Sequence, residues 1–420
     1  MSHVMTLVYA CALAVAVFVG LAVTAEGVAR FALRRTPYRV YPRRFRLRVH
    51  PHAETFAPEL DPGRVVRFDA DDHGARVTEV PAGQRIRQPY RLFVGGGSAV
   101  ECFFLDQDAT WPAVLGRELH QRTGALAAAG YDGVQVAIYA KSGVDALDLA
   151  HVVTHCLPRG RFDAAVLMVG GSSVIRWLTA GAPADWCPGL RPLDAIYSEH
   201  PERRYTWSLQ GSAAREAIRR LHARLTTPVF ERHNVGSFVG RGRRMRQQAE
   251  EIITTVPDPA PMLDGFEVGV RRAIRVARER VPDVFCLAQP NYFRPDMTPR
   301  ERELLWLGGV GNVLTEEVRR FFAAEVMSDL MRQANERLRL VCEQEGVVYV
   351  ESSDLLSPFP RHFYDSWHLT EYGAEVLGAF VADLMGEHVA SRRRPSARAA
   401  RPAPAASPAA GQAPDVSVAG

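Results

Sequence analysis

Two short stretches, far apart in the chain, hold residue types that serve acid–base and nucleophilic chemistry. Ser98 directly follows three glycines (95–97), and Asp365 lies three residues before His368. Glycines let the chain turn sharply, so a serine that follows them can project into a crevice. An aspartate one turn before a histidine can fix the imidazole tautomer and stabilise the imidazolium. Together the three side chains offer a nucleophile, a base and an orienting carboxylate.

Each stretch alone has a plainer interpretation. A Gly-Gly-Ser turn is more often only structural, and an Asp-x-x-His pair is more often a surface pair or a helix cap. The glycines form neither a Walker phosphate loop, since no Gly-Lys-Ser/Thr follows, nor a dinucleotide fingerprint, whose spacing fails. The chemistry therefore depends on a fold that brings both stretches to one place.

Short apolar runs alternate with helix-like stretches between about residues 90 and 386. We expect five strands, at 91–94, 134–140, 164–169, 284–288 and 347–350. Apolar strands separated by helices predict a parallel sheet that helices cover on both faces, a three-layer α/β/α arrangement. Function in such sheets gathers in the loops beyond the carboxyl ends of the strands, where the turn at 95–98 lies.

The stretches around Ser98, Gly143, Ser172 and Asp365–His368, in this order along the chain, resemble the motifs of the SGNH/GDSL hydrolase superfamily. The resemblance is to a membrane-anchored bacterial-type member. Ser98 occupies the nucleophile position, Gly143 lies in the second motif, and Asp365 and His368 form the last. The resemblance implies a flavodoxin-like fold with a five-stranded parallel sheet. It also implies that His368 removes the Ser98 proton, that an acyl-enzyme forms, and that the Ser98 and Gly143 amides hold the oxyanion.

The third motif departs from the family pattern. Ser172 occupies the position of the family's oxyanion asparagine, and Ser173 that of the aspartate after it. Loss of one oxyanion donor costs roughly 10²–10³ in turnover in another serine hydrolase. A serine side chain is shorter than an asparagine side chain, but its hydroxyl can still donate a hydrogen bond. We therefore expect Ser172 to complete the oxyanion hole and the enzyme to be less active than one with asparagine there.

Residues 4–25 carry no charge, and eight arginines without an acid lie between residues 27 and 53. At about 1.5 Å per residue the uncharged stretch crosses the roughly 30 Å core of a bilayer. We expect a retained anchor at 1–29, because the basic region of a cleaved signal peptide is missing, although 23–25 resembles a cleavage site. The arginines argue for a cytoplasmic body. The resemblance instead favours the outer face of the plasma membrane, which we adopt.

The remaining divisions follow from composition and charge. We expect a basic linker at 30–88, a hydrolase-like domain at 89–388 with an insertion at 180–261, and a disordered Ala/Pro/Arg tail at 389–420. The insertion is either a lid or partner surface, or a solvated appendage. The net charge of +4 lies in the tail, so no nucleic-acid partner is indicated.

Metal and cofactor chemistry is not expected. His151 and His155 lie four residues apart on a predicted helix, which suits zinc, but no glutamate lies between them and no third ligand is near. We interpret them as ordinary helix histidines. Cys102 lies in an apolar run and is interpreted as a small buried hydrophobic residue rather than a thiol nucleophile.

Three functions remain open. The first is a serine esterase that removes small O-acyl groups, such as acetyl, from a glycan or related ester. The second is an acyltransferase that uses the same acyl-enzyme to modify an envelope polysaccharide. The third, suggested by Ser172 and Ser173, is a catalytically degenerate protein that binds glycans or serves as a scaffold.

Overall fold

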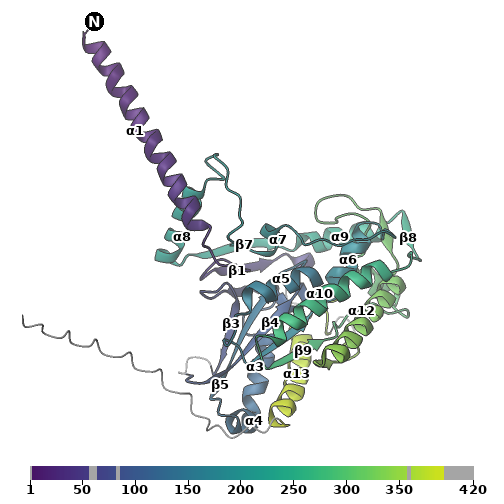
Figure 1. Cartoon of the computed structure of the whole chain (residues 1–420). Coiled ribbons are helices and arrows are strands. Elements are labelled where there is room, and N and C mark those ends of the chain that lie inside the picture. Colours follow the sequence, from purple (N-terminus) through teal and green to yellow (C-terminus); the bar gives the residue numbers. More distant parts are fainter. Residues whose placement is uncertain (1, 56–63, 82–85, 357–360, 392–420) are drawn as a thin grey trace, which may run out of the picture.

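A six-stranded sheet forms the centre of the protein (Figure 1). The structure is a computed structural model, and it describes residues 2–55, 64–81, 86–356 and 361–391. The strand order is β11-β9-β6-β4-β5-β3. The strands are β3 (Arg76–Val80), β4 (Pro89–Gly96), β5 (Gly133–Ala140), β6 (Ala164–Met168), β9 (Asp283–Leu287) and β11 (Val348–Val350). The five predicted strands are β4, β5, β6, β9 and β11, and neighbours among them are parallel. Their order is that of the flavodoxin-like arrangement, with the switch point between β4 and β6.

The prediction of a five-stranded, wholly parallel sheet is wrong at one edge. There β3 adds a sixth strand, antiparallel to β5, from the segment 30–88 that we expected to be a linker. This strand has the sequence RVTEV, and most of its residues are only partly buried. An edge strand keeps one side open to water, so it needs no continuous apolar run and escapes a search for such runs.

Helices cover both faces of the sheet, so the predicted three-layer architecture is confirmed. The helices of these layers are α3 (Trp111–Gln121), α4 (Thr123–Ala128), α5 (Ala146–Cys156), α6 (Gly171–Thr179), α10 (Ala260–Arg278), α12 (Ala324–Glu345) and α13 (Glu371–Ser391). Gly116 of α3 lies against Val136 of β5, whereas Leu149 of α5 lies against Gly95 of β4. Since Gly95 pairs with Tyr139 and side chains alternate along a strand, these contacts are on opposite faces.

The insertion at 180–261 is tied to the amino-terminal segment rather than appended to the surface. Here β7 (Val229–Val235) runs parallel to β1 (Arg46–Pro51), which pairs antiparallel with β2 (Val66–Asp69). A second small sheet joins β8 (Glu251–Ile253) to β10 (Arg320–Phe322). The remaining elements are the 3-10 helix η1 (Ala53–Thr55) and the helices α2 (Ser98–Glu101), α7 (Leu193–Ile196), α8 (Ala213–Thr226), α9 (Ser237–Gln247) and α11 (Pro299–Glu303).

The first helix, α1 (Ser2–Leu33), extends away from the body, as Figure 1 shows. Within the described residues it is the one helix long and apolar enough to cross a membrane, over His3–Leu33. Its carboxyl end packs on α8 through Ala29, Leu33 and Ala213. Of the expected tail at 389–420, the first three residues belong to α13, and 392–420 lie outside the described residues.

Candidate active site

The fold brings Ser98, His368 and Asp365 into one hydrogen-bonded line. The Ser98 hydroxyl lies 2.7 Å from Nε2 of His368, and Nδ1 of His368 lies 2.7 Å from Oδ2 of Asp365. Ser98 follows β4, at the switch point of the sheet, and begins α2. Asp365 and His368 lie in the loop before α13. This spacing lets an imidazole accept the hydroxyl proton while the carboxylate fixes its tautomer.

Close approach of the backbone explains the glycines before Ser98. A Cβ on Gly96 would lie 2.3 Å from the carbonyl oxygen of Met168, and one on Gly97 would lie 2.9 Å from that of Val144. A larger residue at either position would push the nucleophile loop away from the neighbouring strand ends. The glycines therefore seat Ser98 against the loops that follow β5 and β6.

Asp365 is fully enclosed, and donors satisfy both of its carboxylate oxygens. Trp306 donates its indole N–H to Oδ2 at 2.8 Å, and the amides of Trp367 and His368 donate to Oδ1 at 3.1 and 2.9 Å. Burial raises the pKa of Asp365, but the charge and hydrogen bond of His368, with the Trp306 and Trp367 bonds, outweigh it and hold the pKa below its ordinary value. The carboxylate therefore remains ionised beside the imidazole.

The imidazole of His368 is also held from a second side. The ring of Tyr364 stacks on it, with 5.5 Å between ring centroids and 13° between planes. Arg243 of α9 donates to the carbonyl oxygen of Tyr364 at 3.0 Å. The insertion thus contributes a side chain that fixes the backbone next to Asp365.

Removal of the indole donor alone tests how far Trp306 positions the carboxylate. We expect Trp306→Phe to lower kcat about tenfold, since a hydrogen bond to a charged group contributes about 1.5–3 kcal/mol. Steady-state kinetics on a soluble ester measure the change. Trp177→Phe is the matched control, because that buried indole donates instead to the carbonyl oxygen of Pro183 at 3.0 Å. Equal kcat values for the two variants would contradict the role of Trp306.

The low pKa of Asp365 also predicts how stability depends on pH. Because the native pKa lies below the unfolded value, the unfolded chain binds more protons as the pH falls. The stabilising contribution is therefore present above about pH 4, the ordinary carboxyl range, and is lost as the pH falls through the native pKa. On acidification we therefore expect the unfolding free energy of the wild type to fall relative to that of Asp365→Asn. Denaturant unfolding at neutral pH and at about pH 3.5 measures it, and a constant difference would contradict the prediction.

The predicted oxyanion residues lie beside the nucleophile loop. Ser172, at the start of α6, is half-buried, and its Oγ lies 3.0 Å from the position of a Cβ on Gly97. Gly143 follows β5 with a φ of +80°, a left-handed conformation that favours glycine. The guanidinium of Arg191 packs over Gly143, since a Cβ there would lie 2.7 Å from Nη1. Their roles in holding an oxyanion stay a prediction.

Glu101 connects the first and second motifs. Its buried carboxylate accepts hydrogen bonds from the amide of Ser142 at 2.7 Å and from the Ser142 hydroxyl at 2.5 Å. The Tyr41 hydroxyl donates to its other oxygen. Glu101 thereby holds the loop that carries Gly143 against the helix that carries Ser98.

We expect Ser172→Ala to lower kcat about tenfold, less than the 10²–10³ that a complete oxyanion donor contributes elsewhere. The reason is that a short hydroxyl reaches the oxyanion less well than a carboxamide. Ser173→Ala is the control, because the Ser173 Oγ accepts instead from the Ala146 amide at 3.3 Å and faces α5. An unchanged kcat in Ser172→Ala would exclude Ser172 from the oxyanion hole.

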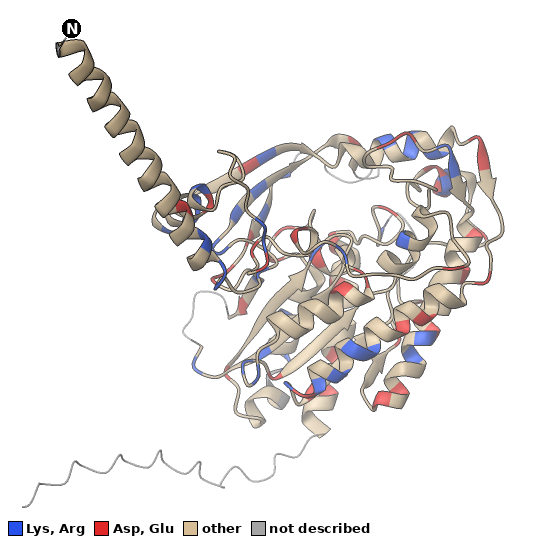
Figure 2. Cartoon of the chain, turned by 45° about the horizontal axis from the view of Figure 1, so that its top comes forward, with Lys and Arg blue, Asp and Glu red and all other residues tan. Residues whose placement is uncertain are grey.

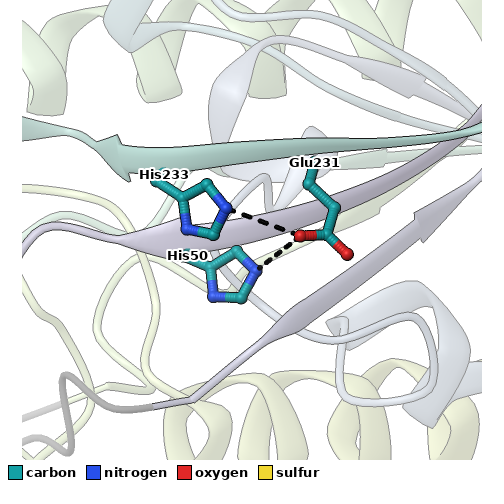
Figure 3. A group of neighbouring side chains, drawn as sticks. All are labelled: His50, Glu231 and His233. Carbon is teal, nitrogen blue, oxygen red and sulfur yellow. Dashed lines mark ion pairs between the residues drawn. The ribbon is translucent and has the colours of Figure 1, made fainter.

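A group of side chains that can bind a metal lies away from this site, on β1 and β7 (Figure 3). Nε2 of His50 and Nε2 of His233 lie 3.8 and 3.5 Å from Oε2 of Glu231, and the imidazoles stack at 4.1 Å. Two imidazoles and a carboxylate suit divalent transition metals. However, Glu231 and His233 are exposed, and Arg48, the register partner of Glu231, pairs with Asp69 at 2.6 Å. These contacts are those of a surface ion-pair cluster, which includes none of Ser98, Asp365 and His368.

The weaker candidates from the sequence have other partners. His151 hydrogen-bonds to the Tyr197 hydroxyl at 2.7 Å, and the ring of His155 packs on Tyr38 at 4.0 Å. Burial lowers the pKa of His151 to about 4. Cys102 is buried, which raises the pKa of its thiol to about 12. The interpretation of Cys102 as a small hydrophobic residue is confirmed.

Comparisons with known proteins find similarity to solved structures. No family model matches the sequence, and no curated protein matches it. Among solved structures, a protein of Desulfitobacterium hafniense DCB-2 described as lipolytic and of the G-D-S-L family is 8% identical, with a TM-score of 0.36 over 70% of this chain and 99% of that one. The acetylxylan esterase of Geobacillus stearothermophilus is 13% identical (TM-score 0.37; 72% and 96% covered), and an alpha/beta hydrolase from a Lake Arreo metagenome is also 13% identical (TM-score 0.39; 72% and 97%). TM-scores this low establish neither a family nor a function for this chain.

Proposed function

We propose that the protein is a serine esterase of the SGNH type that forms an acyl-enzyme on Ser98. The observation that carries the proposal is the unbroken line of hydrogen bonds from Ser98 through His368 to Asp365. This line lies beyond the carboxyl end of β4, where doubly wound sheets place their ligands. A degenerate binding protein has no need of a buried, fully satisfied carboxylate behind the imidazole.

In the proposed reaction His368 first accepts the Ser98 proton while the serine oxygen attacks the ester carbonyl. The amides of Ser98 and Gly143 and the hydroxyl of Ser172 stabilise the oxyanion. The imidazolium then protonates the departing alcohol, which leaves the acyl group on Ser98. Water, deprotonated by His368, attacks the acyl-enzyme and releases the acid, and His368 returns the proton to Ser98.

We propose a small acyl group, such as acetyl on a glycan or related ester, as the substrate. Trp367 is buried, and its ring would lie 3.3 Å from a Cβ on Gly171, the residue before Ser172. Phe293 packs edge-to-face with this ring, at 5.5 Å between centroids. The indole thus fills the space next to Ser172, which limits the length of acyl chain that can lie there.

The test uses the full chain in detergent with nitrophenyl esters of increasing acyl length. We expect kcat/KM to be highest for the acetyl ester and to fall for longer chains, with Ser98→Ala as the blank. No turnover of any ester would favour a degenerate protein. If a glycan acceptor were added and became acylated in place of free acid release, the protein would be a transferase.

The proposed location is the plasma membrane, with α1 as a single-pass anchor and the body on its outer face. The exposed apolar surface of α1 supports the anchor. Reporter fusions at the carboxyl terminus test the orientation. If a reporter that functions only in the cytoplasm were active in this fusion, the body would lie on the inner face, as the arginines after residue 27 favour.

A further inference from the structure

Hydrogen bonds from α8 to the carboxyl-terminal part of α1 fix the position of α8. The carboxylate of Glu26 accepts from the amides of Ala213 and Ala214, the first residues of α8, at 3.0 and 2.9 Å. It also accepts from Arg30 at 2.8 Å. The first amides of a helix have no partner inside the helix, and a carboxylate there is favoured by the helix dipole. With Ser212 as the N-cap, which accepts from the Arg215 amide, Glu26 holds the first turn of α8 against α1.

This contact places α8 at one boundary of the bilayer. Glu26 is the first charged residue after the 22 uncharged residues 4–25. If those residues cross the hydrocarbon core, which is about 30 Å thick, Glu26 and the start of α8 lie among the lipid headgroups. Figure 1 shows α8 against the lower end of α1, with the loop before α8 reaching up beside it.

The outer face of α8 is apolar and exposed. Ile218, Leu221 and Leu225 are 68%, 56% and 77% exposed and lie on one face at helical spacing. In the loop before α8, Trp207 and Leu209 are 69% and 91% exposed. The Arg30 guanidinium lies 4.8 Å from the Trp207 ring, which holds this loop to α1. An apolar patch of this kind on a body beside an anchor is typical of a membrane contact.

Positive charge surrounds this apolar face. A cleft of about 300 Å³ between the end of α1 and α8 is lined by six arginines, with Glu199 as its acid: Arg35, Arg39, Arg43, Arg219, Arg220 and Arg224. Three carboxylates pair with these arginines: Glu199 with Arg39 and Arg220, Glu216 with Arg219 and Arg220, and Asp72 with Arg43. Six guanidinium groups against three carboxylates leave the cleft with a net positive charge. Figure 2 shows basic residues gathered where α1 meets the body. Guanidinium groups match the geometry and charge of phosphate.

We propose that α8 and the loop before it form a second membrane contact, which lies in the headgroup layer of an anionic bilayer. Ile218, Leu221, Leu225, Trp207 and Leu209 enter the layer, and the arginine cleft binds the phosphate of an anionic phospholipid. This contact rests on the anchor in the proposed function. Since α1 and α8 both touch the bilayer, the body is held at a fixed orientation instead of swinging on one helix.

The test reads depth in the membrane with the full chain in nanodiscs. Cys11 and Cys187 are exposed and are replaced by alanine and serine, so that one new cysteine carries an environment-sensitive fluorophore. Leu225→Cys is compared with Leu340→Cys. Leu340 is 37% exposed and belongs to α12, a helix that lies far from α1 in Figure 1. We expect blue-shifted emission at 225, with quenching by headgroup-labelled lipid at least twofold stronger than at 340. Equal, water-like emission at both positions would overturn the proposal.

The dependence on lipid charge tests the cleft. In discs with one-third phosphatidylglycerol we expect stronger quenching at 225 than in neutral phosphatidylcholine, and Arg219→Gln with Arg224→Gln should abolish this difference. Equal quenching in the two lipids would contradict the binding of a lipid phosphate in the arginine cleft. Failure of the chain to enter discs would contradict the anchor and the surface together. Ester turnover is measured on the same samples, and its absence alongside normal quenching would contradict only the hydrolase.

Discussion

Replacement of Ser98 by alanine is expected to lower ester hydrolysis by about 10⁶, the loss seen when a serine protease loses its nucleophile. The Ser98 hydroxyl is the atom proposed to attack the carbonyl, and no other described hydroxyl is hydrogen-bonded to His368. The fold should be unaffected, because Ser98 is only partly buried and its side chain is short. Steady-state kinetics and thermal unfolding of the full chain measure the two effects.

Ser353→Ala is the matched control for this substitution. The Ser353 hydroxyl also makes a side-chain hydrogen bond, to Glu351, but lies in the loop after β11 and outside the proposed machinery. We expect wild-type turnover from it. If Ser98→Ala kept more than a small fraction of the wild-type rate, another residue would have to be the nucleophile.

Asp365→Asn is expected to lower kcat by about 10⁴, as the corresponding change does in a serine protease. One oxygen of Asp365 accepts from both Trp306 and His368. An amide has only one oxygen, so its NH₂ group would face either the Trp306 indole and the His368 imidazole together at the Oδ2 position, or the amides of Trp367 and His368 at the Oδ1 position, and all of these are donors. The histidine would then turn or adopt the wrong tautomer, and Nε2 would no longer accept the Ser98 proton.

The expected loss is in kcat rather than in binding, because Asp365 is enclosed and does not reach the substrate. Asp383→Asn is the control, since that exposed carboxylate only pairs with Arg122 on the surface. Similar kinetics for the two variants would mean that Asp365 stabilises the loop without orienting His368.

The central sheet was predictable because its five parallel strands are buried on both faces. Such strands read as continuous apolar runs, which are visible in a single sequence. The strands β1, β2 and β3 lie at an edge or in a small sheet, and polar side chains interrupt their apolar residues. One of the pairings, of β1 with β7, joins residues about 180 positions apart, and no local pattern specifies it.

The candidate catalytic residues were predictable for a different reason. Ser98, Asp365 and His368 lie in short motifs whose residue types and spacing carry the chemistry. Trp306 and Arg243 carry no such signal, because their partners near residue 365 are 59 or more residues away and are set by the tertiary fold. The position of Glu101 is likewise set by the tertiary fold, which buries its carboxylate against Ser142.

The measurement that tests the central claim most directly is fluorophosphonate labelling of the full chain, followed by peptide mass spectrometry. An activated serine forms the adduct, whereas an ordinary hydroxyl does not. We predict one adduct per chain, on the peptide that contains Ser98, and its loss in His368→Ala. An unlabelled chain, an adduct elsewhere, or labelling that survives His368→Ala would contradict activation of Ser98 by His368.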